Sequence, residues 1–94
     1  MSDDFFEWDD AKAAANRIKH DVSFDEAKQV FNDRYSDSFD DPEHSDDEDR
    51  FVIIGATFTP RLLFVSFVEL GDKLRIISAR EVTPQERYDY ENQP

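Results

Sequence analysis

The chain has no cysteine and only two glycines among its 94 residues. Without cysteine it can form neither a disulfide nor a thiolate metal site, which is typical of proteins from a reducing cytosol. With two glycines it cannot build a glycine-rich loop around a phosphate, and it has no P-loop, dinucleotide-binding, nucleophile-elbow or zinc-ligand spacing. The sequence therefore argues against thiolate metal sites and against nucleotide sites built on a glycine-rich phosphate loop.

Long hydrophobic runs are also missing. The longest apolar stretches, residues 51–56 and 62–68, have the length of strands and are too short to span a bilayer. The first ten residues are acidic and lack the basic and apolar regions of a signal peptide. These absences predict a cytoplasmic protein without membrane contact, and the length predicts a single domain over residues 1–94.

Basic residues are scarce. Eleven Lys and Arg stand against 23 Asp and Glu, which gives a formal net charge of −12. Proteins that bind nucleic acid usually present a basic surface, so this charge argues against such a role. The charge is uneven, however, because residues 1–50 hold 17 acids and six bases, and residues 51–94 hold six acids and five bases. A local basic pocket can survive in the second half, and the acidic half favours a basic protein partner.

Two helices are predicted in the N-terminal half. Asp9 or Asp10 can cap the first helix, over residues 11–20, and Ser23 with Glu26 makes a capping box for the second. The spacing of apolar residues predicts two core-facing stripes. These stripes are Ala11, Ala14, Ala15 and Ile18 on the first helix, and Phe24, Ala27, Val30 and Phe31 on the second. A polar stripe on the first helix comprises Lys12, Asn16, Lys19 and His20.

Three segments rich in β-branched and aromatic residues predict strands at 50–58, 62–70 and 73–81. Turn residues separate them, which predicts an antiparallel meander. Residues 35–39 alternate in a way that permits a fourth, edge strand, and Phe5–Trp8 is a short strand or an extended lead-in.

A capping box at Thr83 and Glu86, with proline at the first helical position, predicts a short helix from Pro84 to about Asn92. The expected fold is α+β. It has two N-terminal helices packed on a three- to four-stranded antiparallel sheet, and a short C-terminal helix.

Two pairs of cationic side chains are candidates for chemistry. Lys19 and His20 stand together at the end of the first helix, where they either serve a site or complement the helix dipole. Arg75 and Arg80 lie in an apolar strand, where they either line a cleft or pair with carboxylates. Their spacing puts them on opposite faces of a regular strand, unless a bulge re-aims one or the strand ends before Arg80.

The remaining polar and aromatic clusters have simpler interpretations. The acid-rich run around His44 and Glu48 has no EF-hand spacing and no glycine, so we expect a solvated loop and no metal. Trp8 is expected in the core and not as a base-stacking platform. Lys12, Asn16 and Arg17 are expected at the helix surface.

Short motifs along nearly the whole chain match one family in order and spacing. They are F-E-W-D at 6–9, K-H at 19–20, V-S-F-x-E-A at 22–27, H-S-x-x-E-x-R-F at 44–51, R-L-L-x-V at 61–65, R-I-I-S-A-R at 75–80 and E-R-x-x-Y-E at 86–91. In this combination the chain resembles the BrnT family, the toxin half of BrnT–BrnA type II toxin–antitoxin systems of bacteria.

The resemblance implies a RelE-like fold and a metal-free endoribonuclease, without cofactor, that inhibits translation. In such chemistry a base activates a ribose 2′-OH, an acid protonates the leaving 5′-oxygen, and cationic side chains stabilise the developing charge. The candidate residues that this scheme implies are Lys19, His20, Glu48, Arg50, Arg75, Arg80 and Tyr90, with Arg87 beside Tyr90.

The resemblance also implies partners. RNA, free or on the ribosome, is the implied substrate. A BrnA-like antitoxin is the implied protein partner. It is a DNA-binding protein of the ribbon-helix-helix type, and operator DNA is reached only through it.

The chain departs from the family pattern in two ways. Asp21 stands where the family usually has glycine, and a helix end that needs positive φ accepts aspartate at some cost. The strong negative charge supports an alternative function, a catalytically weak or silent acidic module that binds a basic partner. Mimicry of nucleic acid is disfavoured because the acids of residues 40–49 fall in an expected loop and not in regular rows.

Overall fold

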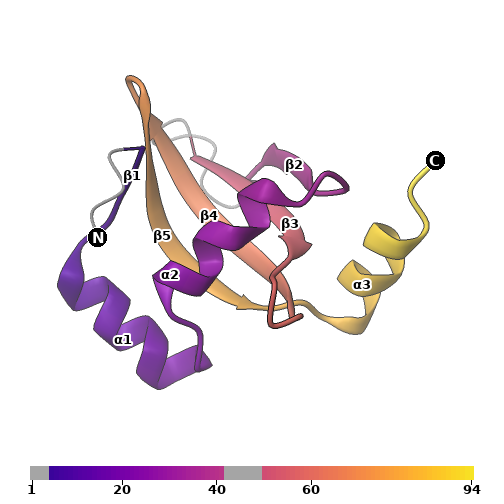
Figure 1. The fold of residues 1–94 in the computed structure, drawn as a ribbon, viewed down its shortest axis with the longest axis horizontal. Helices are drawn as coiled ribbons and strands as arrows, with labels where there is room; N and C mark the ends of the chain where they lie inside the picture. The colour runs from indigo at the N-terminus through magenta and orange to yellow at the C-terminus, as the bar shows by residue number, and fades with distance from the viewer. Residues whose placement is uncertain (1–4, 42–49) are drawn as a thin grey trace.

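The computed structural model describes residues 5–41 and 50–94, and the sequence-predicted acidic loop therefore lies mostly outside the described residues. Helices and strands both contribute, so the α+β class is confirmed (Figure 1). The elements are β1 (Phe6–Glu7), α1 (Asp10–His20), α2 (Phe24–Ala27), the 3₁₀ helix η1 (Lys28–Asn32), β2 (Asp37–Asp40), β3 (Arg50–Ala56), β4 (Leu62–Leu70), β5 (Lys73–Glu81) and α3 (Pro84–Glu91). None of the described helices is long and apolar enough to cross a membrane.

The sheet has five strands in the order β1-β5-β4-β3-β2. The expectation of three to four antiparallel strands was wrong in detail, because β1 adds a fifth strand and runs parallel to β5. The other neighbours are antiparallel, with the predicted meander β3-β4-β5 at the centre. β3 ends at Ala56, two residues before the expected Phe58, since the chain turns there toward β4. The permitted edge strand is present as β2.

α1 packs differently from the sequence-based expectation. Its predicted apolar stripe was wrong, because Ile18 is 87% exposed while Asn16, expected at the surface, is only 6% exposed. The reason is that α1 lies along the edge of β5 beyond the end of β1. There the backbone of β5 offers hydrogen-bonding groups, which an amide satisfies and an alkyl side chain cannot.

The predicted core face of the second helical segment is confirmed. The segment is α-helical for one turn, continues as η1 and lies across one face of the sheet (Figure 1). Its buried residues pack with the inner side chains of β3, β4 and β5. Trp8 packs against this cluster, edge-on to Phe24 at 5.8 Å between ring centroids, as predicted. The buried members are Val22, Phe24, Ala27, Val30, Ile53, Leu63, Val65, Phe67, Ile76 and Ala79.

The opposite face of the sheet has a smaller core. Val52, Ile54 and Leu62 are buried there, and Val82 and Tyr90 from the C-terminal segment pack against them. α3 begins with the predicted capping box, in which Thr83 Oγ1 accepts from Glu86 N and the Glu86 carboxylate accepts from Thr83 N. Figure 1 shows α1 and α3 at opposite sides of the molecule.

Candidate active site

A shallow cavity of about 210 Å³ lies where α1 meets the edge of β5. Its lining consists of Lys12, Ala15, Asn16, Lys19, His20, Ile77 and Ser78. The polar stripe that the sequence predicted on the first helix thus lies beside β5, with Asn16 buried against the strand, Lys12 and Lys19 exposed at the rim of the cavity, and His20 half-buried. The cavity brings together Lys19 and His20, two of the candidate residues, and adds Lys12, which was expected at an ordinary helix surface.

The cavity lining contains no carboxylate. Within residues 5–41 and 50–94, neither Lys12 nor Lys19 nor His20 forms an ion pair. On a chain with a net charge of −12, a cavity lined by two lysines and a histidine is a local inversion of the charge. Such a cavity can attract an anion of the size of a phosphate group.

Asn16 fixes the geometry of this cavity from below. Its amide Nδ2 donates to Val22 O at 3.0 Å and to Ala79 O at 2.9 Å, and its Oδ1 accepts from Ala79 N at 3.1 Å. These bonds hold α1, the following loop and β5 in one arrangement. The relative positions of Lys19, His20 and Ser78 therefore depend on a side chain that is only 6% exposed.

A β-bulge decides which way the strand arginines point. Ser66 pairs with Ser78 and Phe67 pairs with Ile76, so Ile77 has no partner on β4. Across this bulge Arg75 and Arg80 lie on the same face of the sheet, the face opposite to α2. Of the alternatives that the spacing left open, the bulge is therefore confirmed.

The register places further candidates beside them. Arg50 and Arg75 both pair with Val68, from β3 and β5 respectively, so they flank this residue on one face. Ser78, which lines the cavity, lies between Arg75 and Arg80 along the same strand. The cavity thus opens at the edge of the face that carries the three arginines.

The two arginines of β5 are nevertheless held by carboxylates. Arg75 Nη1 lies 2.6 Å from Glu7 Oε2, because Glu7 is its register partner on β1. Arg80 forms a bidentate pair with Glu86 at 2.9 and 3.0 Å and stacks over the ring of Phe64 at 4.0 Å. The hydrogen bond from Arg80 holds the pKa of the Glu86 carboxyl below its usual value. Of the two alternatives left open for these arginines, lining a cleft or pairing with carboxylates, the structure shows the ion pairs. Their role as site residues stays a prediction.

Tyr90 lies on α3, on the other side of the molecule from the cavity (Figure 1). Its hydroxyl donates to Asp33 Oδ2, which also accepts from Ala56 N. Burial and the hydrogen bond to Asp33 raise the pKa of Tyr90 to about 12. Burial opposes the charge of Asp33, but the hydrogen bonds from Tyr90, Ala56 and Tyr35 outweigh it and lower the pKa of that carboxyl. Tyr90 thus attaches α3 to the sheet.

The remaining candidates are Arg87 and Glu48. Arg87 lies on α3 near Glu91, at 3.7 Å, and both side chains are more than half exposed. Glu48 lies outside the described residues.

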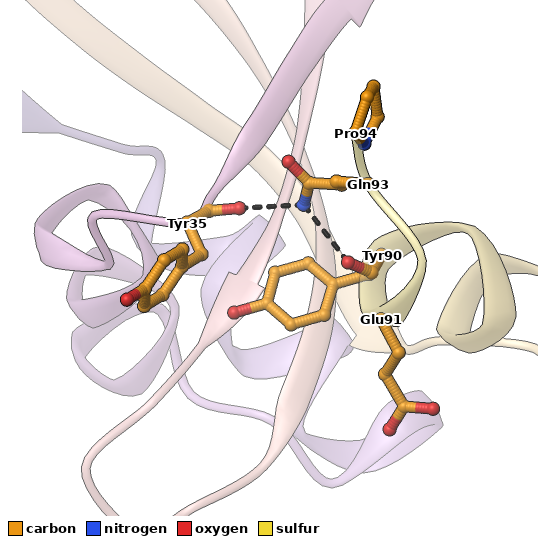
Figure 2. Close-up of a pocket in the computed structure, with 5 residues that line it drawn as sticks. All are labelled: Tyr35, Tyr90, Glu91, Gln93 and Pro94. Atoms are coloured by element: carbon orange, nitrogen blue, oxygen red, sulfur yellow. Dashed lines mark hydrogen bonds between the residues drawn. The ribbon is translucent and has the colours of Figure 1, made fainter.

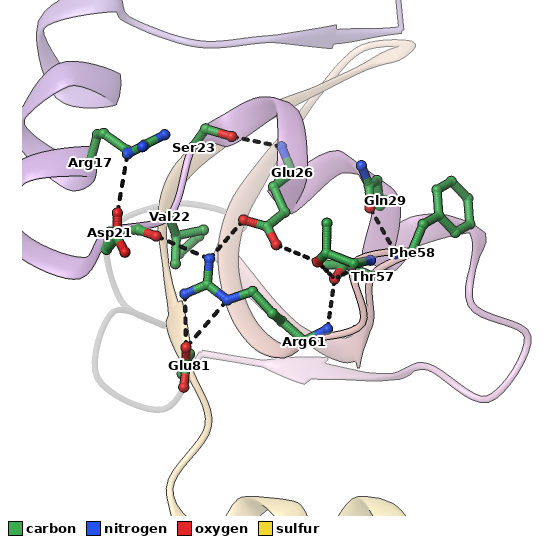
Figure 3. Close-up of polar contacts among 12 residues, drawn as sticks. Arg17, Asp21, Val22, Ser23, Glu26, Gln29, Thr57, Phe58, Arg61 and Glu81 are labelled. Carbon is green, nitrogen blue, oxygen red and sulfur yellow. Dashed lines mark hydrogen bonds and ion pairs between the residues drawn. The ribbon is translucent and has the colours of Figure 1, made fainter.

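Sequence reasoning missed a polar cluster around Arg61 (Figure 3). The guanidinium donates to Asp21 O at 3.0 Å, to Glu26 at 2.8 Å and to Glu81 at 2.8 Å, which ties α1, α2 and the ends of β4 and β5 together. Burial opposes the charge of Arg61, but Glu81 and Glu26 outweigh it and raise the pKa of the guanidinium. The signal was an arginine directly before an apolar strand, which is costly unless paired.

The same cluster changes the predicted capping box of the second helix. Ser23 Oγ accepts from Glu26 N at 3.0 Å, as expected. The Glu26 carboxylate, however, binds Arg61 and the hydroxyl of Thr59. Only the half of the box that Ser23 provides is therefore present among the described contacts.

The fold and this site define a small α+β protein with a cation-lined cavity at the edge of a mixed sheet. The crystal structure of the ribonuclease toxin BrnT from Brucella abortus is similar, with a TM-score of 0.66 and 23% sequence identity over 83% of this chain and 95% of that one. At this identity the likeness shows a shared fold. None of the curated proteins compared with the chain matches it.

Residues 8–86 match the family described as the ribonuclease toxin, BrnT, of type II toxin-antitoxin systems. This match covers most of the chain, and the chain belongs to that family. Membership of a type II toxin–antitoxin family implies an antitoxin partner. The family that the sequence motifs indicated is confirmed.

Proposed function

We propose that the chain is an endoribonuclease toxin that cleaves RNA without a metal ion and so inhibits translation in the cytoplasm. The observation that carries the proposal is the cavity between α1 and β5, where Lys12, Lys19 and His20 meet without a carboxylate in the lining. Family membership supports the same activity. A RelE-like mechanism needs only proton transfer and charge stabilisation, and this cavity offers groups for both.

The reaction assigns a role to each group. The 2′-OH loses its proton to a base as its oxygen bonds to the adjacent phosphorus. The bond from phosphorus to the 5′-oxygen then breaks, and an acid protonates that oxygen. The products are a 2′,3′-cyclic phosphate and a free 5′-OH. Imidazole is the side chain most often used for proton transfer, so His20 is assigned one of the two transfers. In-line displacement puts the 2′- and 5′-oxygens on opposite sides of phosphorus, so a second group takes the other transfer, and Glu48 is the candidate for it from the family resemblance. Lys19, with Lys12 beside it, stabilises the negative charge that develops on the phosphate.

The strand arginines extend this site along the sheet. A flanking phosphate of the RNA can replace Glu7 at Arg75 or Glu86 at Arg80, because guanidinium groups bind phosphate and carboxylate in the same bidentate geometry. Arg50 lies on the same face and is assigned to phosphate contact as well. Glu48 and Tyr90 remain candidates from the family resemblance alone.

The antitoxin is proposed to be a BrnA-like DNA-binding protein of the ribbon-helix-helix type. It neutralises the toxin and brings it to operator DNA. A basic protein suits a partner with a net charge of −12, because opposite charges speed association.

The test measures cleavage of a fluorescent RNA by the purified chain in the presence of EDTA. We expect products that end in a 2′,3′-cyclic phosphate, and a loss of at least about 100-fold in rate for Lys19→Ala or His20→Ala. The matched control is Lys73→Ala, which removes the same charge at the exposed first residue of β5, outside the cavity lining. Equal activity of Lys19→Ala and Lys73→Ala would contradict the assignment of the site.

The second candidate function is a catalytically silent acidic module that binds a basic protein. The ion pairs of Arg75 with Glu7 and of Arg80 with Glu86 favour it, because they neutralise two cations that RNA would need. A folded chain that forms a stable complex with its antitoxin, yet cleaves no RNA once stripped of it, would support this function. A complex that is insensitive to salt would argue that charge does not drive it.

A further inference from the structure

β2 is an edge strand of the sheet. Among residues 5–41 and 50–94 it pairs with β3 alone, and all four of its residues are exposed. The amide of Asp41, just beyond the strand, donates inward to Arg50 O at 3.1 Å. Because inward and outward groups alternate along an antiparallel pair, Ser38 and Asp40 direct their backbone N–H and C=O groups away from the sheet. These groups are able to pair with an added strand.

The negative charge of this edge favours a basic segment as the added strand. Asp37 and Asp40 are exposed on opposite faces of β2, and neither forms an ion pair within the described part of the chain. Residues 35–41 contain no lysine or arginine. An extended segment with basic side chains on both faces would therefore be attracted to the edge, and an RNA strand would be repelled.

A pocket of about 330 Å³ adjoins the start of β2 (Figure 2). It is lined by Tyr35, Tyr90, Glu91, Gln93 and Pro94. Gln93 Nε2 donates to Tyr35 O at 2.8 Å and to Tyr90 O at 3.1 Å, which joins the end of α3 to the segment before β2. Tyr35 and Glu91 already contact cations of this chain, because Arg34 lies 5.3 Å from the centre of the Tyr35 ring and Arg87 lies 3.7 Å from the Glu91 carboxylate. An arginine or a lysine of a partner suits the same groups, through cation–π contact and ion pairing, and would exchange with these two contacts.

We propose that the free edge of β2 binds a basic, extended segment of the antitoxin as an added strand, with one cationic side chain of that segment seated between Tyr35 and Tyr90. This proposal rests on the proposed function for the identity of the partner. Backbone pairing at Ser38 and Asp40 supplies the affinity, and the pocket with Glu91 fixes the register. β2 lies at the other edge of the sheet from β1 and β5, and the pocket beside it shares no lining residue with the cavity of α1 and β5. RNA bound in that cavity and this segment therefore contact different lining residues.

The test uses a fluorescein-labelled peptide that alternates valine with arginine and lysine as its probe. Fluorescence anisotropy with the full chain measures its Kd, and backbone NMR locates it. We expect the amides of Ser38 and Asp40 to shift most and to gain protection from hydrogen exchange. N-methylation of alternate peptide amides keeps the charge but removes strand pairing, and should weaken binding at least about tenfold.

Two matched variants separate the effect of the pocket on peptide binding from the effect of the net charge. Glu91→Gln should weaken the peptide about tenfold, and Asp72→Asn, which removes the same charge at the exposed turn between β4 and β5, should change it less than about twofold. Equal binding of the N-methylated peptide, or shifts that avoid β2, would overturn the proposal. RNA cleavage is measured separately on the same samples. Cleavage without peptide binding would refute this surface alone, and peptide binding without cleavage would refute the nuclease function alone.

Discussion

The side-chain amide of Asn16 pairs with the backbone of Ala79 as a neighbouring strand would. It accepts from Ala79 N and donates to Ala79 O, at 3.1 and 2.9 Å, and it is 63 residues away in sequence. Within the described part of the chain β1 pairs with β5 at Leu74 and Arg75, and Asn16 satisfies the edge of β5 beyond the C-terminal end of β1. One buried amide therefore sets the position of the helix that carries Lys19 and His20.

Asn16→Asp should destabilise the chain by about 3 kcal/mol, because the carboxylate oxygen that replaces Nδ2 would face the carbonyl oxygens of Val22 and Ala79 instead of donating to them. Asn16→Leu should cost about 2 kcal/mol by leaving the backbone groups of Ala79 unpaired. Urea unfolding followed by circular dichroism measures both values. The control is Ala15→Ser, one residue earlier and exposed, with an expected change of less than about 0.5 kcal/mol. Two Asn16 variants as stable as this control would show that the amide bonds contribute nothing.

Asp21 ends α1 in the left-handed conformation, with φ 56° and ψ 38°. The glycine that the family usually has at this position indicated a helix end with positive φ. Asp21→Gly should therefore stabilise the chain by about 0.5 kcal/mol, the relief of strain being partly offset by the entropy of glycine in the unfolded state. Asp21→Ala should destabilise it by about 1 kcal/mol. The ion pair with Arg17 is lost in both variants and is mostly exposed, so it contributes little to the difference. Thermal unfolding of the two variants should give opposite shifts in Tm, and shifts of the same sign would contradict this account.

The pair of Tyr90 and Asp33 predicts a dependence of stability on pH. The pKa of Tyr90 is raised to about 12 from 10.0, so its contribution is fully present below pH 10 and is lost as the pH rises through about 12. The pKa of Asp33 is lowered, so its contribution is present above its ordinary value of 3.8 and is lost as the pH falls through the lower folded value.

Tyr90→Phe removes the donor and should cost about 1–2 kcal/mol at neutral pH. The variant should also lose less of its free energy of unfolding than the parent chain does, both between pH 10 and 12 and as the pH falls below 3.8. Urea unfolding at several pH values measures this, and absorbance at 295 nm should show one tyrosine that ionises late in the parent chain and is missing in the variant. Tyr88→Phe, at an exposed position of the same helix, is the control. A late-ionising tyrosine that persists in Tyr90→Phe would contradict the assignment.

Local patterns predicted the parts of the fold that local physics determines. The bounds of β4 and β5 and the capping box of α3 follow from residue type and short-range hydrogen bonds, and all three are as expected. The parallel pairing of β1 is a contact between Phe6 and Leu74, and no pattern within either segment encodes it. The apolar stripe of α1 failed for the same reason, because the helix packs on a strand edge whose free backbone groups arise only from the tertiary fold.

The candidate site shows the same division. The sequence shows that Lys19 and His20 are neighbours. It also shows that Arg75 and Arg80 are five residues apart, a spacing that puts them on opposite faces of a regular strand. The bulge at Ile77 brings them to one face, and its position depends on how β4 and β5 align. The carboxylates that hold the two arginines come from β1 and α3, so their choice among 23 acids required the three-dimensional structure.

Glu86 holds Arg80 in a bidentate pair, and this pair is expected to limit RNA binding. Glu86→Gln keeps an oxygen that can accept from Thr83 N, so α3 should remain capped, while the charge that binds Arg80 is removed. Because the freed guanidinium gains a phosphate contact, RNA affinity should rise about threefold to tenfold, with a stronger dependence on salt. Stability should fall by about 1 kcal/mol through loss of the partly buried pair.

Glu69→Gln is the matched control for this variant, because Glu69 is exposed on β4 and its substitution changes the net charge equally. Filter binding or anisotropy with a short labelled RNA, in a range of salt concentrations, measures both variants. A larger gain for Glu86→Gln than for Glu69→Gln assigns the effect to Arg80, since the global field changes by the same amount in each. Equal gains would mean that the reduced negative charge alone favours RNA, and Arg80 would then lose its place among the phosphate-contacting residues.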